Sequence, residues 1–260
     1  MNKFIKDVKN YFFYTVYSAK AELKSEIANS RLSCLWWVLD PLLFMLVYTF
    51  VVKVVFDRGT ANFPVFVFIG LTVWNFFNKV LTSSVKLVLA NKSIVSKVYI
   101  PKYILLIQKI FVYLFKMLIS FLIIIVMLFF YKIPFTFTML HCVILLIVLI
   151  TVTFSISIFL LHFGIFVEDL SNVIKPLLRL MFYMSGIIYS IPDRIPATYS
   201  WILLDLNPIA LLANEFRNVI MYNIAPNYYM VGCWFLIALI FSLIGIRLIQ
   251  KRENSYVKVI

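Results

Sequence analysis

Long apolar runs alternate with short polar stretches along the whole chain. A helix needs about 20 apolar residues to cross the hydrocarbon core of a bilayer, and only helices or closed barrels satisfy the backbone there. The runs have helix length, and the fifth is the shortest. The sequence therefore predicts an all-α polytopic membrane protein with six transmembrane helices at Trp36–Phe56, Phe63–Leu81, Tyr103–Tyr131, His141–Phe166, Val173–Tyr189 and Tyr228–Leu248.

Two further segments are expected at the membrane without crossing it. In residues 1–33 apolar side chains recur every three or four positions, which predicts an amphipathic interfacial helix on the cytoplasmic side. The apolar stretch Ile195–Met221 is interrupted by prolines and charges, which favours a re-entrant or interfacial pair of short helices. With no linker between the runs, we expect one domain, in which residues 36–251 form the membrane core and 252–260 a cytoplasmic tail.

Composition excludes a water-soluble protein. Hydrophobic residues make up 63% of the chain and charged residues 13%, against roughly 25% charged residues in soluble domains. The net charge of +13 does not indicate nucleic-acid binding, because the bases lie between apolar runs and form no single basic surface.

The positions of Lys and Arg predict that both termini are cytoplasmic, because basic residues concentrate in cytoplasmic loops. The segments predicted to be cytoplasmic contain many bases: Lys3, Lys6, Lys9, Lys20, Lys24, Arg31, Lys86, Lys92, Lys97, Lys102, Lys251, Arg252 and Lys258. The alternate segments contain few, and acids partly offset them: Arg58, Lys132, Arg194 and Arg217, with Asp193, Asp205 and Glu215.

Three lysines repeat every seven residues along the third span, at positions 102, 109 and 116, so they share one helix face. A charge at mid-span, as at Lys116, costs at least roughly 2.5 kcal/mol unless it meets protein, water or an anion. Two interpretations stay open: the lysine stems reach to the interface, or Lys109 and Lys116 line a pathway. The sequence contains no GxxxxGK[ST] phosphate loop and no metal-ligand spacing, so we expect no catalytic, cofactor or metal site in this chain.

Five short motifs follow one another along nearly the whole chain: Leu35–Pro41 (LWWVLDP), Val73–Phe77 (VWNFF), Asn91–Pro101 (NKSIVSKVYIP), Phe182–Ser185 with Tyr189, and Asn207–Pro208 ahead of Phe216–Arg217. In this order they resemble the permeases of ABC-2-type exporters of polysaccharides, O-antigens and teichoic acids. Three positions depart from the usual pattern of these permeases. Ser33 stands where Gly is common, Glu168 where Arg is common, and Gly186 where Pro is common.

The resemblance implies a half-transporter in a bacterial inner or plasma membrane. Two copies of the chain would form a channel for a lipid-linked, undecaprenyl-type polysaccharide. Two separate ATPase subunits would bind ATP and Mg and drive export. The residues expected to contact the ATPase are those of the coupling segment: Asn91, Lys92, Ile94, Lys97, Val98, Tyr99 and Pro101.

The resemblance also implies a substrate pathway and a gate. The N-terminal amphipathic helix would be the cytoplasmic gate helix beside the substrate. Basic and aromatic side chains near the lipid phosphates and the sugars are the candidate pathway: Lys109, Lys116, Tyr14, Tyr17, Trp36 and Trp37. The short helices before the last span would be the outward-side gate, with Ile195, Pro196, Trp201, Asn207, Pro208, Phe216 and Arg217.

Three other functions remain open from the sequence. A teichoic-acid exporter would use the same basic residues for a phosphate-rich polymer. An ABC permease for a small drug or lipid would have the same span pattern. An integral-membrane glycosyl- or acyltransferase would need convergent acids or a histidine, and Asp40, Asp57 and His162 form no convincing set.

Overall fold

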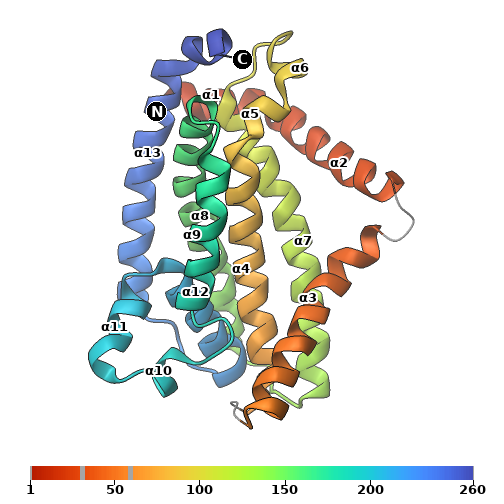
Figure 1. The fold of residues 1–260 in the computed structure, drawn as a ribbon, viewed down its shortest axis with the longest axis vertical. Helices are drawn as coiled ribbons and strands as arrows, with labels where there is room; N and C mark the ends of the chain where they lie inside the picture. The colour runs from red at the N-terminus through yellow and green to blue at the C-terminus, as the bar shows by residue number, and fades with distance from the viewer. Residues whose placement is uncertain (1, 30–32, 58–60, 260) are drawn as a thin grey trace.

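The computed structural model describes residues 2–29, 33–57 and 61–259, and within these ranges the regular structure is helical (Figure 1). Among the described residues, five helices are long and apolar enough to cross a membrane, which confirms an all-α polytopic membrane protein. They are α3 (Ser33–Thr49, extended by a π-helical turn at Phe50–Val55), α4 (Phe63–Val85), α7 (Lys102–Phe130), α8 (His141–Phe166, preceded by a 3-10 turn at Phe137–Leu140) and α13 (Tyr228–Val259).

Helix α4 is the centre of the bundle. It packs against α3, α7, α8 and α12, and its side chains are buried on nearly all sides. A helix that is apolar all round is expected at such a position. Gly164 of α8 lies directly against the Val85 carbonyl at the end of α4, where an added Cβ would overlap that backbone. Close helix approach at a small residue is the usual packing of membrane helices.

The fifth predicted span, Val173–Tyr189, forms helix α9 (Leu170–Met184). Its 15 residues are about 22 Å long, shorter than a bilayer core. The helix ends at Ser185 and Gly186, and Gly186 has a φ of 60°, the left-handed conformation that commonly terminates helices. The count of six complete spans therefore stays a prediction. Both termini lie toward the same end of the molecule in Figure 1. If that end faces one side of the membrane, the number of crossings is even, and α9 would be the sixth crossing beside the five long helices.

The predicted N-terminal helix is divided into α1 (Asn2–Asn10) and α2 (Phe12–Asn29). The backbone hydrogen bonds continue through Tyr11, so the division is a bend. Thr15 Oγ1 donates to the Tyr11 carbonyl at 2.8 Å, and this type of back-bond bends helices. Helix α2 slopes away from the bundle axis along α7 (Figure 1).

One end of the bundle, here called the basic end, brings together three segments that are far apart in sequence. These are α1, the loop with the short helices α5 (Leu87–Ala90) and α6 (Lys92–Val95), and the end of α13 (Figure 1). The expected tail at 252–260 is a continuation of α13 as far as Val259. Arg31 and Arg58, which entered the charge pattern, lie outside the described residues.

The opposite end contains the short helices that were expected before the last span. They are α10 (Ile191–Arg194), α11 (Ala197–Asp205) and α12 (Pro208–Arg217), which a π-helical turn at Asn218–Tyr222 follows. Helix α11 is largely exposed, whereas α12 is buried against α4 and α8. The predicted pair of short helices in Ile195–Met221 is therefore present as α11 and α12.

We expect Gly164→Ala to destabilise the bundle, because the new methyl group must push α8 away from the backbone of α4. Overpacking of this kind costs about 1–3 kcal/mol. Gly232→Ala is the matched control, since a Cβ there meets nothing within 4 Å. The measurement is the midpoint of thermal unfolding in detergent. Equal midpoints for the two variants would contradict the close α4–α8 contact.

Candidate functional site

Helices α3, α4 and α9 enclose an open groove of about 610 Å³. Aromatic side chains from all three helices line it. The ring centroid of Phe182 lies 5.4 Å from Trp74 and 6.0 Å from Tyr48. The other lining residues, with their polar and charged groups, are Asp40, Phe44, Leu71, Asn75, Asn78, Lys79, Thr82, Lys175, Leu178, Arg179 and Tyr183.

The groove carries more positive than negative charge. Lys79 Nζ lies 3.8 Å from Asp40 Oδ2, and both side chains are about half exposed. Lys175 and Arg179 are four residues apart on α9, so they share a face of that helix. Three bases against one acid, beside flat aromatic rings, suit a ligand that combines sugar rings with phosphate or another anion.

The sequence interpretation missed this groove. It treated Val173–Tyr189 as a plain span, although the i, i+4 pair of Lys175 and Arg179 was a readable signal of a polar face. It also did not connect α9 with α3, since no periodicity shows which helices are neighbours. Both helices contain an internal proline, Pro41 and Pro176, and an internal proline removes a helical hydrogen bond and allows a kink.

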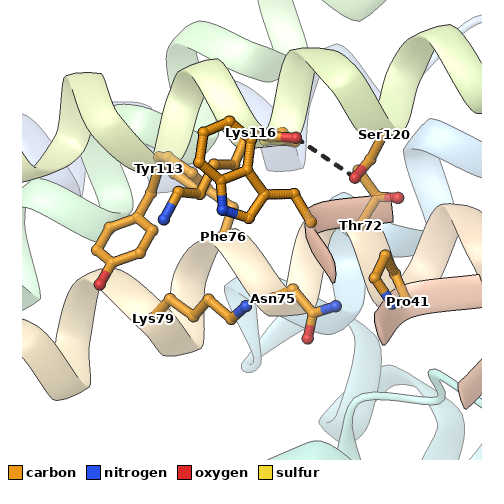
Figure 2. A pocket seen from close by; sticks show the side chains of 10 residues that line it. Pro41, Thr72, Asn75, Phe76, Lys79, Tyr113, Lys116 and Ser120 are labelled. Carbon is orange, nitrogen blue, oxygen red and sulfur yellow. Dashed lines mark hydrogen bonds between the residues drawn. The ribbon is translucent and has the colours of Figure 1, made fainter. Parts of the chain in front are cut away.

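A smaller cavity of about 40 Å³ lies beside the groove, between α3, α4 and α7. Figure 2 shows Asn75 and Lys79 of α4 opposite Tyr113 and Lys116 of α7. Asn75 and Lys79 line both spaces. The cavity is large enough for ordered water, and it places Lys116 next to the groove.

Lys109 and Lys116 of α7 both have carboxylate partners on α2. Lys109 Nζ forms a close ion pair with Glu22, which also accepts from Gln108 Nε2 at 2.7 Å. Lys116 Nζ lies 2.6 Å and 2.9 Å from the two carboxylate oxygens of Glu26. All four charged side chains are at least partly buried. Two acids four residues apart on α2 therefore pair one to one with two lysines seven residues apart on α7.

Trp37 completes the surroundings of Lys116. Its Nε1 donates to Glu26 Oε2 at 3.2 Å, and the ammonium of Lys116 lies 5.1 Å from its ring centroid. Of the other predicted pathway residues, Tyr14 packs partly buried against the core, while Tyr17 and Trp36 are exposed. None of these six residues lines the larger groove. Their role in a pathway stays a prediction.

The predicted coupling segment lies at the basic end and is mostly exposed. Lys92, Ile94, Lys97, Val98 and Tyr99 are exposed, Asn91 is half-buried, and Pro101 is buried as the residue before α7. The segment thus presents apolar and basic side chains together at the surface.

Tyr99 joins the coupling segment to both ends of the chain. Its hydroxyl donates to Glu253 Oε2 at 2.8 Å, and its carbonyl accepts from Tyr11 at 3.1 Å. Partial desolvation and the Glu253 carboxylate raise the pKa of Tyr99 to about 12, so the phenol remains a donor at neutral pH. Lys3 Nζ lies 4.0 Å from the same Glu253 carboxylate.

Arg217, the cation among the predicted gate residues, is buried. Its guanidinium donates to the carbonyls of Phe66 at 3.1 Å, Gly186 at 2.9 Å and Ile187 at 2.8 Å. It also lies 3.6 Å from the Phe66 ring centroid. The Gly186 and Ile187 carbonyls belong to the turn that follows α9. Arg217 therefore fastens α12 to α4 and to the end of α9.

Asn207 makes a second connection between α12 and α9. Its side-chain oxygen caps α12 by accepting from Ile209 N at 3.1 Å, and its Nδ2 donates to Ser185 Oγ at 2.9 Å. Of the remaining gate residues, Pro208 and Phe216 are buried in α12, while Ile195, Pro196 and Trp201 are half-buried or exposed. The structure thus divides the predicted gate into a fastened helix α12 and an exposed segment around α11.

Long apolar helices around a polar groove, with a buried short helix, α12, at one end, define a multi-pass membrane protein. The chain belongs to the ABC-2 type transporter family, which it matches over residues 15–221. It is 28% identical to an O-antigen export system permease protein RfbA of Klebsiella pneumoniae over 240 residues, 92% of each chain. It is 25% identical over 228 residues to a protein of the same name from Myxococcus xanthus, 87% of each chain. The motif-based resemblance is confirmed.

We expect Arg217→Lys to destabilise the protein, because an ammonium lacks the planar fork that reaches three carbonyls. Leaving one buried carbonyl without a donor costs about 1–3 kcal/mol. Arg194→Lys is the control, since Arg194 is exposed. Thermal unfolding in detergent measures the difference, and unchanged stability of Arg217→Lys would show that the buried fork is dispensable.

Proposed function

We propose that this chain is the membrane permease subunit of an ATP-driven exporter that moves a lipid-linked polysaccharide out of the cytoplasm. The observation that carries the proposal is the similarity to O-antigen export permeases over almost the full length of both chains. The groove between α3, α4 and α9 supports it, because its rings suit the C–H faces of sugars and its bases suit phosphate. In this function the chain is not an enzyme, and a partner subunit hydrolyses ATP.

Two copies of the chain form the channel in this proposal. The groove is open, and its walls carry Lys79, Lys175 and Arg179. Lipid against such a surface is unfavourable, since charged side chains in membrane segments face protein or water. A second copy that covers the groove removes these charges from lipid and turns two grooves into one polar conduit.

The basic end is the cytoplasmic side in this proposal. The N-terminal helices, the coupling segment and the end of α13 meet there (Figure 1), and their lysines follow the positive-inside rule. The exposed side chains of residues 92–99 supply the surface for the ATPase subunit. Through Tyr99 and Glu253, movement of that surface reaches α13 directly.

The net positive charge of the groove favours one second candidate, an exporter of teichoic acid. Such a polymer carries phosphate in every repeat, so it would use Lys79, Lys175 and Arg179 along its whole length. A neutral polysaccharide would meet these bases only with its lipid-linked diphosphate.

We expect substrate-stimulated ATPase activity when the chain is co-expressed with the ATPase from a neighbouring gene and placed in nanodiscs. The double substitution Lys97→Glu, Tyr99→Ala should abolish most of the stimulation, because it reverses a charge and removes the link to Glu253. Lys132→Glu, a charge reversal away from the coupling segment, is the control and should retain it. If no ATPase co-purifies and the chain alone modifies a lipid-linked sugar, the permease proposal is wrong and a membrane transferase replaces it.

The groove gives a separate prediction. The double substitution Lys175→Gln, Arg179→Gln should lower stimulation by lipid-linked polysaccharide at least about tenfold, because two charge-assisted contacts are lost. Arg247→Gln is the control, since Arg247 is an exposed base of α13 that does not line the groove. Stimulation equal to that of the unsubstituted protein would exclude the groove as the substrate path.

A further inference from the structure

Charges, more than apolar packing, fasten α2 to the bundle. Among its described side chains only Thr15 and Ala19 are buried, and large apolar residues such as Phe13 and Tyr17 are exposed. Its polar contacts to α7 are the pairs that Glu22 and Glu26 make. A helix with so little buried apolar surface belongs to the less stable parts of a fold. Loss of the ion pairs would therefore weaken the attachment of α2 to α7.

The groups that surround the two carboxylates are all hydrogen-bond donors. Glu22 accepts from Gln108 and Lys109, and Glu26 accepts from Lys116 and Trp37. Amide, ammonium and indole donors of this kind bind phosphate oxygens as well as they bind carboxylates. A diphosphate that joins a lipid to a sugar keeps one negative charge on each phosphorus. It therefore carries the same total charge as the two carboxylates that now occupy these donors.

The donor cluster also lies next to the proposed substrate path. Lys116 belongs both to the cluster and to the cavity in Figure 2, which shares Asn75 and Lys79 with the groove. An anion released from Lys116 toward α4 would meet the ammonium of Lys79 next. Cations thus line this cavity on two sides, Lys116 on α7 and Lys79 on α4, and Lys79 leads on to the groove, where it also pairs with Asp40.

Building on the proposed export function, we propose that Glu22 and Glu26 are internal substitutes for the substrate diphosphate. The diphosphate headgroup of the lipid-linked polymer binds to Gln108, Lys109, Lys116 and Trp37 in place of the two carboxylates. Helix α2 is then released from α7 and opens the way to the groove. In the absence of substrate, α2 closes the site with its own charges.

The test uses the chain without its ATPase in phosphatidylcholine nanodiscs, with undecaprenyl-diphosphate-linked N-acetylglucosamine as the probe. The readouts are probe affinity and hydrogen–deuterium exchange of residues 12–29. We expect the probe to accelerate exchange in this segment. Glu22→Gln, Glu26→Gln should show fast exchange without probe and bind the probe about tenfold more tightly, because an internal competitor lowers apparent affinity. Glu168→Gln, an exposed acid outside this cluster, should behave like the unsubstituted protein.

A charge swap separates this proposal from a purely structural ion pair. Glu26→Lys combined with Lys116→Glu keeps an ion pair and hence slow exchange of α2, but it places a carboxylate among the phosphate donors. Probe affinity should fall at least about tenfold. Unchanged affinity in the swapped protein, or no gain in the double glutamine variant, would overturn the proposal. If the glutamine variant does not fold, the swap alone decides.

Two further arms identify the source of the anion. Inorganic pyrophosphate in solution and phosphatidylglycerol in the disc should each leave the exchange of α2 unchanged, because pyrophosphate has no lipid to hold it in the membrane and phosphatidylglycerol has a single phosphate. If either one releases α2 as well as the probe does, the headgroup assignment is wrong. These measurements need no ATP, so a failure of ATP-driven export with intact probe binding would contradict the export function and leave the binding site standing.

Discussion

The cost of placing charge inside an apolar bundle governs this structure. A cation at membrane depth requires a partner within the protein, and the chain provides two kinds. Arg217 is surrounded by backbone carbonyls of α4 and of the turn after α9, which the fold holds in place. Lys109 and Lys116 depend instead on carboxylates of a peripheral helix. The first kind of partner makes a fixed joint, and the second is the contact that, in our proposal, the substrate anion replaces.

The sequence predicted the long helices well because hydropathy determines them almost alone. Phe63–Val85, for example, is apolar over most of its surface and becomes the buried centre. Helix α9 was harder to predict. Lys175, Pro176 and Arg179 interrupt its apolar run, and its end depends on Gly186 and on the carbonyls that Arg217 binds. Whether such a segment crosses the membrane depends on its neighbours, and a single sequence does not name them.

The candidate site was predicted only in part. The seven-residue repeat drew attention to Lys109 and Lys116, and the conspicuous pair of tryptophans led to Trp37. Their partners Glu22 and Glu26 were visible as acids on an amphipathic helix, but their pairing with α7 is a contact between segments more than 80 residues apart. The groove was missed for the same reason, because α3, α4 and α9 come together only in the folded chain.

Helix α4 connects these features mechanically. It is the most enclosed of the long helices, and it contributes Asn75 and Lys79 to both the cavity and the groove. The other walls are less constrained: α3 and α9 each contain an internal proline, and α2 is fastened mainly by charge. In the proposed export function α4 would be the fixed wall of the groove, and the groove would widen by movement of α3 or α9 against it. The fixed joint at Arg217 holds the far end of α9, so the basic end has the greater freedom to open.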